Sequence, residues 1–344
     1  MGSSSRGRPP HGEIPEFPMS VNLHTQRADP APPPPRPGRH QSRSRRRFWS
    51  QLDLKAAPYF LISPYFLLFA IFGLFPLIFT FWVSLQDYGL AGGDASFTGL
   101  ENYSKLLADS DFWNAVVNTV GIFILATVPQ LVLALMLANA LNKRLRGRLF
   151  FRLGVLVPLV TSVVAVAIVF TQLYGRDFGL INWLLEFVGV EQHIDWQSAK
   201  WSSWIAIATM VDWRWTGYNA IIYLAGMQTI PKDLYEAASI DGASPRRQFW
   251  QITLPMIRPT IIFTVFVSTI GGLTLFAEPV MFASNRMDGG ATGQFQTIAM
   301  YIVEQAFRNF DYGYAAAAAW LLFVLILLGV GINYLFIRRI GGAK

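Results

Sequence analysis

The chain has 344 residues, of which 53% are hydrophobic and only 14% are charged, so its composition is not that of an ordinary soluble domain. A mean hydropathy of +0.36 is typical of a protein that crosses a membrane several times. The net charge of +7 does not indicate nucleic-acid binding, because the Lys and Arg residues gather in an N-terminal tail and in alternate loops. The chain has no cysteine, which excludes disulfides, thiolate catalysis and cysteine-based metal sites.

The first 57 residues are rich in Pro, Arg, Ser and His, with APPPPRPGR at 31–39 and RSRRR at 43–47. Such a segment cannot bury enough apolar surface to fold, so we expect residues 1–57 to be a disordered tail. Its basic cluster stands just before the first apolar run, which favours a cytoplasmic location beside anionic lipid.

Six apolar runs follow the tail, and each is long enough to cross the hydrocarbon core, which takes about 20 helical residues. They lie near 60–85, 115–141, 149–173, 203–226, 258–283 and 315–337. The sequence therefore predicts an all-α integral membrane domain over residues 58–344, with six transmembrane helices and the lipid bilayer around them.

The charged residues in the loops predict the orientation of these spans. Loops 142–148 and 227–257 and the C-terminus carry Lys and Arg, whereas loops 86–114 and 174–202 are acidic on balance. Since cytoplasmic loops carry the excess of Lys and Arg, we expect both termini on the cytoplasmic side of the cytoplasmic membrane.

Polar side chains interrupt the fourth apolar run, in the stretch DWRWTGYN. Asp212 and Arg214 lie near its middle, where an ionisable group is expensive and usually faces a cavity. Trp215, Tyr218 and Asn219 add aromatic faces and an amide, which together suit the apolar faces and hydroxyls of a sugar. Alternatively, Asp212 pairs with a basic residue on another span and only holds helices together. The residues leave both interpretations open.

Two further polar residues are candidates for the substrate path. Glu278, close to the outer end of the fifth run, can accept hydrogen bonds from hydroxyls, and Gln172 in the third run could join it. We expect Thr161 and Ser162 to bond to carbonyls of their own helix. The pair Gly271-Gly272 is expected to permit close helix packing.

A polar stretch between the fourth and fifth runs covers residues 231–255, PKDLYEAASIDGASPRRQFWQITLP. Pro231 has its φ preset for a first helical position, and Gly242 stands where the chain must leave that helix with positive φ. Ser244 can cap a second helix whose first residue is a proline, and Leu254-Pro255 should end it. The sequence predicts two short helices joined by a glycine elbow.

The spacing within this stretch resembles a known signature. Glu236-Ala237-Ala238, three residues, Gly242, nine residues, Ile252, one residue and Leu254-Pro255 match the cytoplasmic loop of permease subunits of ATP-binding-cassette (ABC) importers. Further segments resemble carbohydrate-uptake permeases related to the maltose permease: Phe97–Tyr103, Phe178–Asn182, Ala225–Pro231 and Gly313–Ala317. These permeases often carry T-x-G-G-P after the fifth span, whereas here Gly289-Gly290 is followed by Ala291, so the resemblance does not identify the sugar.

The resemblance implies that the loop docks onto a separate ATPase subunit. The residues implied at that surface are Glu236, Ala237, Ala238, Asp241, Gly242, Ala243, Ile252, Leu254 and Pro255. It also implies a second permease subunit, two ATPase subunits that bind ATP and Mg²⁺, and an extracytoplasmic sugar-binding protein.

The chain itself shows no catalytic machinery. A phosphate-binding loop reads G-x-x-x-x-G-K-S/T, and no lysine here is followed by Ser or Thr, so ATP hydrolysis must come from another polypeptide. Three of the four histidines lie in the tail, so no metal site or resident cofactor is expected.

We therefore expect the permease subunit of an ATP-driven importer that moves a neutral sugar or oligosaccharide by alternating access. One alternative keeps the architecture but imports an anionic polyol such as glycerol phosphate. That substrate demands several basic groups, and Arg214 is the one counted within the spans. A more distant alternative is a secondary transporter without ATPase partners, which would need an inverted repeat that the sequence does not show.

Overall fold

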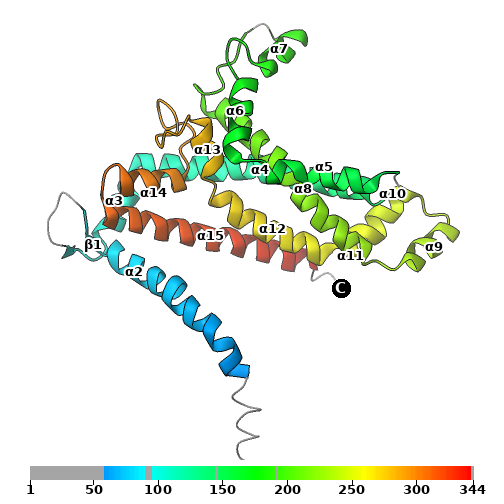
Figure 1. Ribbon diagram of the computed structural model, residues 1–344, viewed down its shortest axis with the longest axis horizontal. Coiled ribbons are helices and arrows are strands. Elements are labelled where there is room, and N and C mark those ends of the chain that lie inside the picture. Colours follow the sequence, from blue (N-terminus) through cyan, green and yellow to red (C-terminus); the bar gives the residue numbers. More distant parts are fainter. Residues whose placement is uncertain (1–57, 90–94, 144–145, 191, 342–344) are drawn as a thin grey trace, which may run out of the picture. The chain divides into compact units, whose positions relative to one another are not determined.

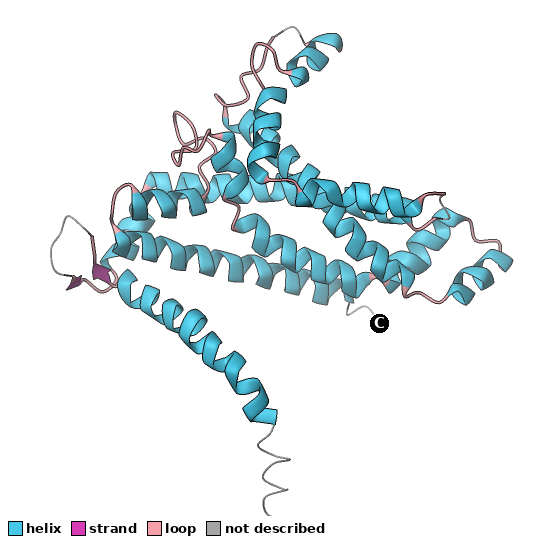
Figure 2. Cartoon of the chain, viewed as in Figure 1, coloured by secondary structure: helices cyan, strands magenta, loops and turns pink. Residues whose placement is uncertain are grey.

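The computed structural model describes residues 58–89, 95–143, 146–190 and 192–341, so the predicted tail, residues 1–57, lies outside the described part. The chain divides into two units, Met1–Phe66 and Leu67–Lys344. In the first unit the described residues, 58–66, are helical. The second unit is built almost entirely from helices, with one pair of two-residue strands (Figures 1 and 2).

The second unit contains the following elements in chain order. They are η1 (Ala70–Leu74), α2 (Phe75–Ser84), β1 (Gln86–Asp87), β2 (Ser96–Phe97), α3 (Glu101–Ala108), α4 (Ser110–Leu141), α5 (Arg148–Val160), α6 (Val163–Leu173), α7 (Leu180–Phe187), α8 (Lys200–Gln228), α9 (Lys232–Ile240), α10 (Pro245–Gln248), η2 (Phe249–Thr253), α11 (Leu254–Met256), α12 (Arg258–Leu273), α13 (Ala277–Phe282), α14 (Ile298–Phe307) and α15 (Tyr312–Gly341). The elements η1 and η2 are π-helices, and β1 pairs antiparallel with β2.

Helices α4 and α8 pack against each other along their lengths and form the centre of the unit (Figure 1). Helix α12 packs against α4, α15 against α12, and α5 against α8. Glycines allow the closest approaches, since a Cβ at Gly121 would overlap the Trp204 ring and one at Gly217 would overlap the Val155 carbonyl. Small residues at helix contacts are the usual means of close packing between membrane helices.

Three helices among the described residues are long and apolar enough to cross a membrane. They are Pro58–Ser84, Ser110–Leu141 and Tyr312–Leu335, and there are up to five if each of two bent helix pairs counts as one span. The fourth predicted run forms one continuous helix, α8, of 29 residues, which is less apolar because it carries residues such as Asp212, Arg214 and Asn219. The all-α membrane class agrees with the sequence prediction, whereas the count of six spans stays a prediction.

The third predicted span is not a single straight helix. Its two halves, α5 and α6, meet at a bend of 90°. Pro158 has no N–H for the Gly154 carbonyl, and Thr161 and Ser162 then take extended ψ values of 138° and 132°. The sequence prediction of one helix over 149–173 is therefore wrong. The Thr161 hydroxyl bonds to the Val157 carbonyl at 2.8 Å, as predicted.

The fifth predicted run, 258–283, is also broken. Helix α12 ends at Leu273, residues 274–276 are not helical, and the short α13 follows. Non-helical backbone at membrane depth is tolerated only where protein buries it or where it lines a cavity. The interruption at 274–276 therefore marks a place to look for a site.

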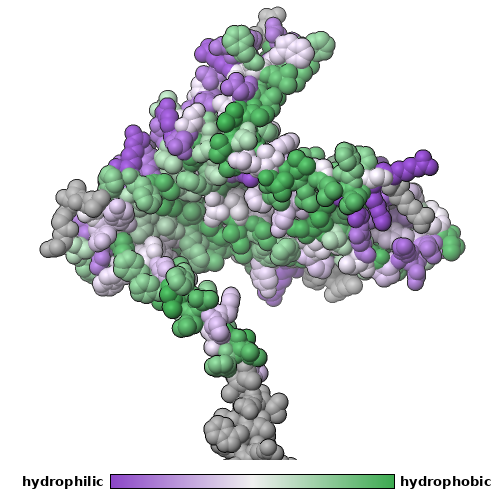
Figure 3. All heavy atoms as spheres, in the orientation of Figure 1, coloured by the Kyte–Doolittle hydropathy of each residue, from purple (hydrophilic) through white to green (hydrophobic). Residues whose placement is uncertain are grey.

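The exposed hydrophobic side chains and the hydrophilic ones occupy different zones of the second unit. Hydrophobic residues cover the middle of the face in Figure 3, over α5 and α8, whereas hydrophilic residues gather near α9 and α10 and around the loop that follows α13. Leu153, Val157 and Ile205 are among the exposed apolar side chains of this zone. Such a band, flanked by polar ends, fits a bilayer core between two aqueous sides.

A half-buried carboxylate connects three helices near the start of α4. Asp109 Oδ2 accepts hydrogen bonds from the hydroxyls of Tyr301 in α14, at 2.6 Å, and Tyr314 in α15, at 2.8 Å. Burial acts to raise the pKa of the Asp109 carboxyl, but the hydrogen bonds from the two tyrosines and the backbone together lower it below its ordinary value. The charged form thus holds the ends of α4, α14 and α15 together.

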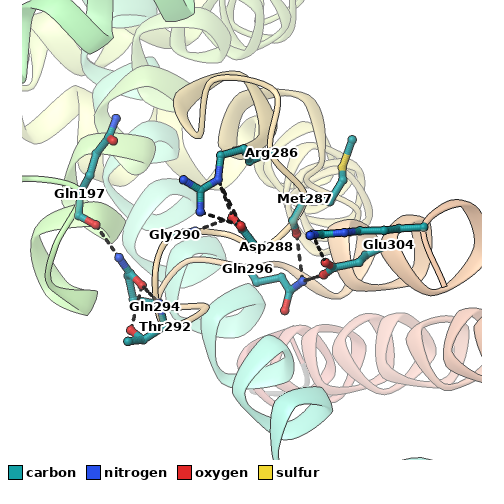
Figure 4. Close-up of polar contacts among 10 residues, drawn as sticks. Gln197, Arg286, Met287, Asp288, Gly290, Thr292, Gln294, Gln296 and Glu304 are labelled. Carbon is teal, nitrogen blue, oxygen red and sulfur yellow. Dashed lines mark hydrogen bonds and ion pairs between the residues drawn. The ribbon is translucent and has the colours of Figure 1, made fainter.

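Polar contacts hold the loop between α13 and α14 against α4 and the segment before α8, and Figure 4 shows those within the loop and to Gln197. Gln294 donates to the Gln197 carbonyl at 2.5 Å, and Asn118 of α4 donates to the Gly293 carbonyl at 2.8 Å. Within the loop, Arg286 and Asp288 form an ion pair at 2.6 Å. Burial acts to raise the pKa of the Asp288 carboxyl, but the hydrogen bonds from Arg286 and the Gly290 N–H, together with the charges of Arg286 and Arg308, lower it below its ordinary value.

Candidate functional site

A cavity of about 480 Å³ lies between α4, α6, α8, α12 and α13. Its walls are mostly apolar, with residues such as Ile122, Val163 and Val267. Residues 274–276, where the fifth predicted run is interrupted, form part of its rim. A largely apolar cavity with a few convergent polar groups is the usual form of a small-molecule site.

Five of the seven predicted substrate-path residues line this cavity. Arg214, Trp215, Tyr218 and Asn219 come from α8, and Glu278 comes from α13. The spacing of the four α8 residues places them on one face of the helix, because positions i, i+1, i+4 and i+5 lie within an arc of about 140°. Helical periodicity thus explains why DWRWTGYN presents these groups together.

An ion pair between Arg214 and Glu278 is the main polar contact of the cavity. Arg214 Nη1 lies 2.5 Å from Glu278 Oε1, and the two side chains are only 13% and 5% exposed. The Trp215 Nε1 lies 3.5 Å from the same carboxylate oxygen, and the guanidinium lies 5.8 Å from the centre of the Trp215 ring. The pair joins α8 to α13 across the interrupted segment and neutralises both charges in the cavity wall.

The other two predicted residues are not among those that line the cavity. Asp212 is half-buried, and its Oδ1 is buried without a hydrogen-bond partner among the described residues. Gln172 lies on the exposed side of α6. Among the described residues, Asp212 forms no ion pair with the basic residue of another span that the scaffold interpretation required. Its role stays a prediction.

Sequence reasoning missed several polar residues, including Ser268 and Thr274, which also line the cavity. Gln130 and Thr127 of α4 line the cavity, and Gln130 is only 4% exposed. The signal for Gln130 was present, because an amide in the second apolar run is as unusual as the residues singled out in the fourth. Arg152 in α5 and Arg258 at the start of α12 also lie within the predicted runs, so the count of Arg214 alone was wrong. The Arg152 Nε is buried without a partner among the described residues.

The predicted docking loop has the expected glycine elbow. Helix α9 is followed by Gly242 at φ 75°, and the Ser244 hydroxyl accepts a hydrogen bond from the Arg247 N–H at 3.4 Å. The proline after Ser244 occupies the first turn of α10, as predicted. Pro231, however, is the residue before α9, with ψ 134°, and not its first helical residue.

The second helix of the loop does not end at Leu254-Pro255 as predicted. It continues through the π-helix η2 and α11 to Met256, and the chain then bends by 67° before α12. Pro255 lacks the N–H that would bond to the Gln251 carbonyl. The wider π turn of η2 precedes this residue, so the proline is accommodated without ending the helix.

Internal contacts hold the two short helices in one folded unit. The hydroxyls of Tyr235 in α9 and Thr253 in η2 lie 2.9 Å apart, and Gln248 donates to Ser239 at 2.8 Å. The signature residues divide into two groups. Glu236, Ala237, Asp241, Gly242 and Pro255 are exposed, whereas Ala238, Ala243, Ile252 and Leu254 are half-buried. The signature therefore combines an accessible surface with the packing that supports it.

Comparisons with known proteins agree with this architecture. Residues 106–342 match the family described as binding-protein-dependent transport system inner membrane component. The chain is 32% identical over 301 residues to an arabinooligosaccharides transport system permease protein of Halalkalibacterium halodurans, covering 87% of this chain and 92% of that protein. It is 35% identical over 254 residues to a lactose transport system permease protein of Rhizobium radiobacter, covering 73% and 84%.

Solved structures show the same fold. A chain of a bacterial ABC transporter involved in the import of the acidic polysaccharide alginate superposes with a TM-score of 0.71. The match covers 87% of this chain and 100% of that one, at 23% identity. The family match spans well over half of the sequence and includes both the cavity and the predicted docking loop. The chain therefore belongs to the family of binding-protein-dependent transport system inner membrane components.

Proposed function

We propose that this chain is the permease subunit of an ATP-driven importer that moves a neutral sugar or oligosaccharide across the cytoplasmic membrane by alternating access. The observation that carries the proposal is the cavity, where the polar and aromatic groups of α8 and α13 converge between apolar walls. Aromatic faces can stack on the C–H side of a sugar, and amide and carboxylate oxygens can accept from its hydroxyls.

Charge in the cavity favours a neutral substrate. Arg214 is the one Lys, Arg or His among the residues that line it, and Glu278 already neutralises its guanidinium. Binding of an anion requires several charge-assisted hydrogen bonds from free basic groups. The names of the arabinooligosaccharide and lactose permeases among the relatives also support a sugar.

The alternative with an anionic polyol has one observation in its favour. The chain is 27% identical over 287 residues to an sn-glycerol-3-phosphate transport system permease protein of Agrobacterium fabrum. The neutralised Arg214 weighs against that substrate in this chain. The alternative of an ATPase-independent secondary transporter gains no support, because the matched family is defined by binding-protein-dependent transport.

The proposal includes three kinds of partner. An extracytoplasmic binding protein delivers the substrate, as the family description implies. Two ATPase subunits bind ATP and Mg²⁺ and contact the exposed signature residues of the loop 231–255, on the cytoplasmic side. A second permease subunit completes the pore, because this chain has one such loop and two ATPases need two. ATP hydrolysis belongs to the ATPase subunits, and this chain is not an enzyme.

Uptake by the complete importer tests the proposed substrate class. The chain is co-expressed with its partner subunits, reconstituted into proteoliposomes and supplied with the external binding protein. We expect ATP-dependent uptake of at least one labelled sugar from a panel of arabinooligosaccharides, maltose and lactose, and no uptake of glycerol 3-phosphate. Liposomes without ATP are the control. Uptake of glycerol 3-phosphate alone, or sugar uptake that does not need ATP, would contradict the proposal.

A further inference from the structure

Two adjacent glycines of α12 lie in different surroundings. A Cβ built on Gly272 would lie 2.5 Å from the Phe123 ring and 3.2 Å from the Thr127 hydroxyl, both on α4. A Cβ built on Gly271 would meet no heavy atom within 4 Å. Gly272 therefore permits close packing of α12 against α4, as the sequence predicted for the pair, whereas Gly271 has no packing contact of this kind.

The backbone does not require glycine at position 271 either. Gly271 lies within the helix α12, and it is not among the glycines with positive φ. Glycine weakens the interior of a helix relative to alanine, because it costs more backbone entropy on folding. A glycine that serves neither packing nor a turn leaves free space, and the space beside Gly271 belongs to the cavity, since Gly271 is part of its wall.

The position is close to the polar groups of the cavity. Ser268, one turn before Gly271 on α12, lies 3.4 Å from the Asn219 amide of α8. Val267 and Thr274, one turn to either side, also line the cavity. A side chain at position 271 would extend from this wall into the part of the cavity beside Asn219.

We propose that Gly271 is a specificity-determining residue that sets the size of the sugar accepted by the cavity. The inference rests on the proposed function, because it assigns the cavity to the substrate. The missing side chain leaves room for a longer or bulkier sugar, and a branched aliphatic side chain at this position would select for a smaller one.

The test compares Gly271→Ala and Gly271→Leu in the reconstituted importer. Uptake is measured with labelled maltooligosaccharides of two to five glucose units and, in parallel, with arabinooligosaccharides of the same lengths. One methylene in a binding pocket changes discrimination by about 10- to 200-fold. We therefore expect Gly271→Leu to lower uptake of the longest accepted sugar at least tenfold relative to the shortest, with a smaller change for Gly271→Ala.

Gly272→Ala is the comparison for packing, because Gly272 also lines the cavity but its added methyl group enters the contact with Phe123. We expect it to lower the melting temperature of the complex. Gly271→Ala should not lower the melting temperature. An unchanged length preference in Gly271→Leu would overturn the inference. Loss of the second permease subunit when the Gly271→Leu complex is purified would also overturn it, because Gly271 would then be a contact with that subunit. A wild-type complex that takes up neither these two sugar series nor lactose would overturn the proposed function as well.

Discussion

At the scale of single residues, the pair Arg214–Glu278 is the most informative contact in the chain. Transferring two charges from water to a membrane protein interior is costly, and their attraction offsets that cost only while both partners are present. The pair therefore stabilises the junction of α8 and α13 and, at the same time, removes net charge from the cavity. Asp212 differs from this pair: it lies two residues before Arg214, and its Oδ1 has no hydrogen-bond partner among the described residues.

Glu278→Gln should leave the Arg214 guanidinium buried without a counter-charge. Breaking a buried pair by removing one partner costs about 3–5 kcal/mol, so we expect a clear fall in the melting temperature of the purified complex. The double variant Arg214→Gln with Glu278→Gln removes both charges and should regain much of that loss, while uptake per folded complex stays low. If the single and double variants were equally stable, the pair would have no structural role.

At the scale of elements, prolines and glycines decide where these helices widen, bend and end. Each π-helix is followed closely by a proline. One residue separates the end of η1 from Pro76, and one residue separates the end of η2 from Pro255. In each, the residue after the π-helix donates its N–H to a carbonyl five residues earlier, Phe75 to Ala70 and Leu254 to Phe249. The wider turn moves the carbonyls away from the proline ring that would otherwise clash with them.

The glycine elbow of the loop 231–255 offers a test at this scale. Gly242 has φ 75° and no heavy atom near a built Cβ, so Gly242→Val strains the backbone without a steric clash. An ordinary residue in the left-handed region costs about 1–2 kcal/mol, whereas asparagine is tolerated there. We expect Gly242→Val to weaken co-purification of the ATPase subunits and to abolish uptake, and Gly242→Asn to behave like the wild type.

Glu236→Lys separates the surface of the loop from its fold. Glu236 is exposed on α9, so reversing its charge should leave the membrane domain folded and weaken only ATPase binding. Normal uptake by both Gly242→Val and Glu236→Lys would show that the loop is a simple connector.

At the scale of the whole molecule, the distribution of Lys and Arg predicts the orientation in the membrane. Because the chain has no cysteine, single cysteines can be introduced without background labelling. Ser198 is exposed in the segment before α8, and Lys232 is exposed at the start of α9. We expect Ser198→Cys to react in intact cells with a membrane-impermeant maleimide, and Lys232→Cys to react only after lysis. The reverse pattern would invert the proposed topology and remove the loop 231–255 from the cytoplasm.

The sequence by itself determined the features that depend on neighbouring residues. The apolar runs, the glycine elbow, the cap at Ser244 and the polar face of α8 all follow from local propensity and helical period, and the structure shows each of them. The motif spacing was sufficient to indicate the family, because the signature lies within one continuous loop.

Only the tertiary structure decided which polar groups meet. Helical periodicity excludes Asp212 as the partner of Arg214, because positions i and i+2 do not face each other. Glu278 lies 64 residues from Arg214 in the sequence, and no local pattern identifies it as the partner. The bend at Thr161 and Ser162 turns α6 through 90°, and Gln172 of α6 is then exposed and absent from the cavity wall. The two neighbouring glycines of α12 were likewise indistinguishable in sequence, and the position of Phe123 on another helix assigns packing to Gly272 and open space to Gly271. Contacts between distant segments depend on how whole helices bend and pack, and a local pattern carries no information about those angles.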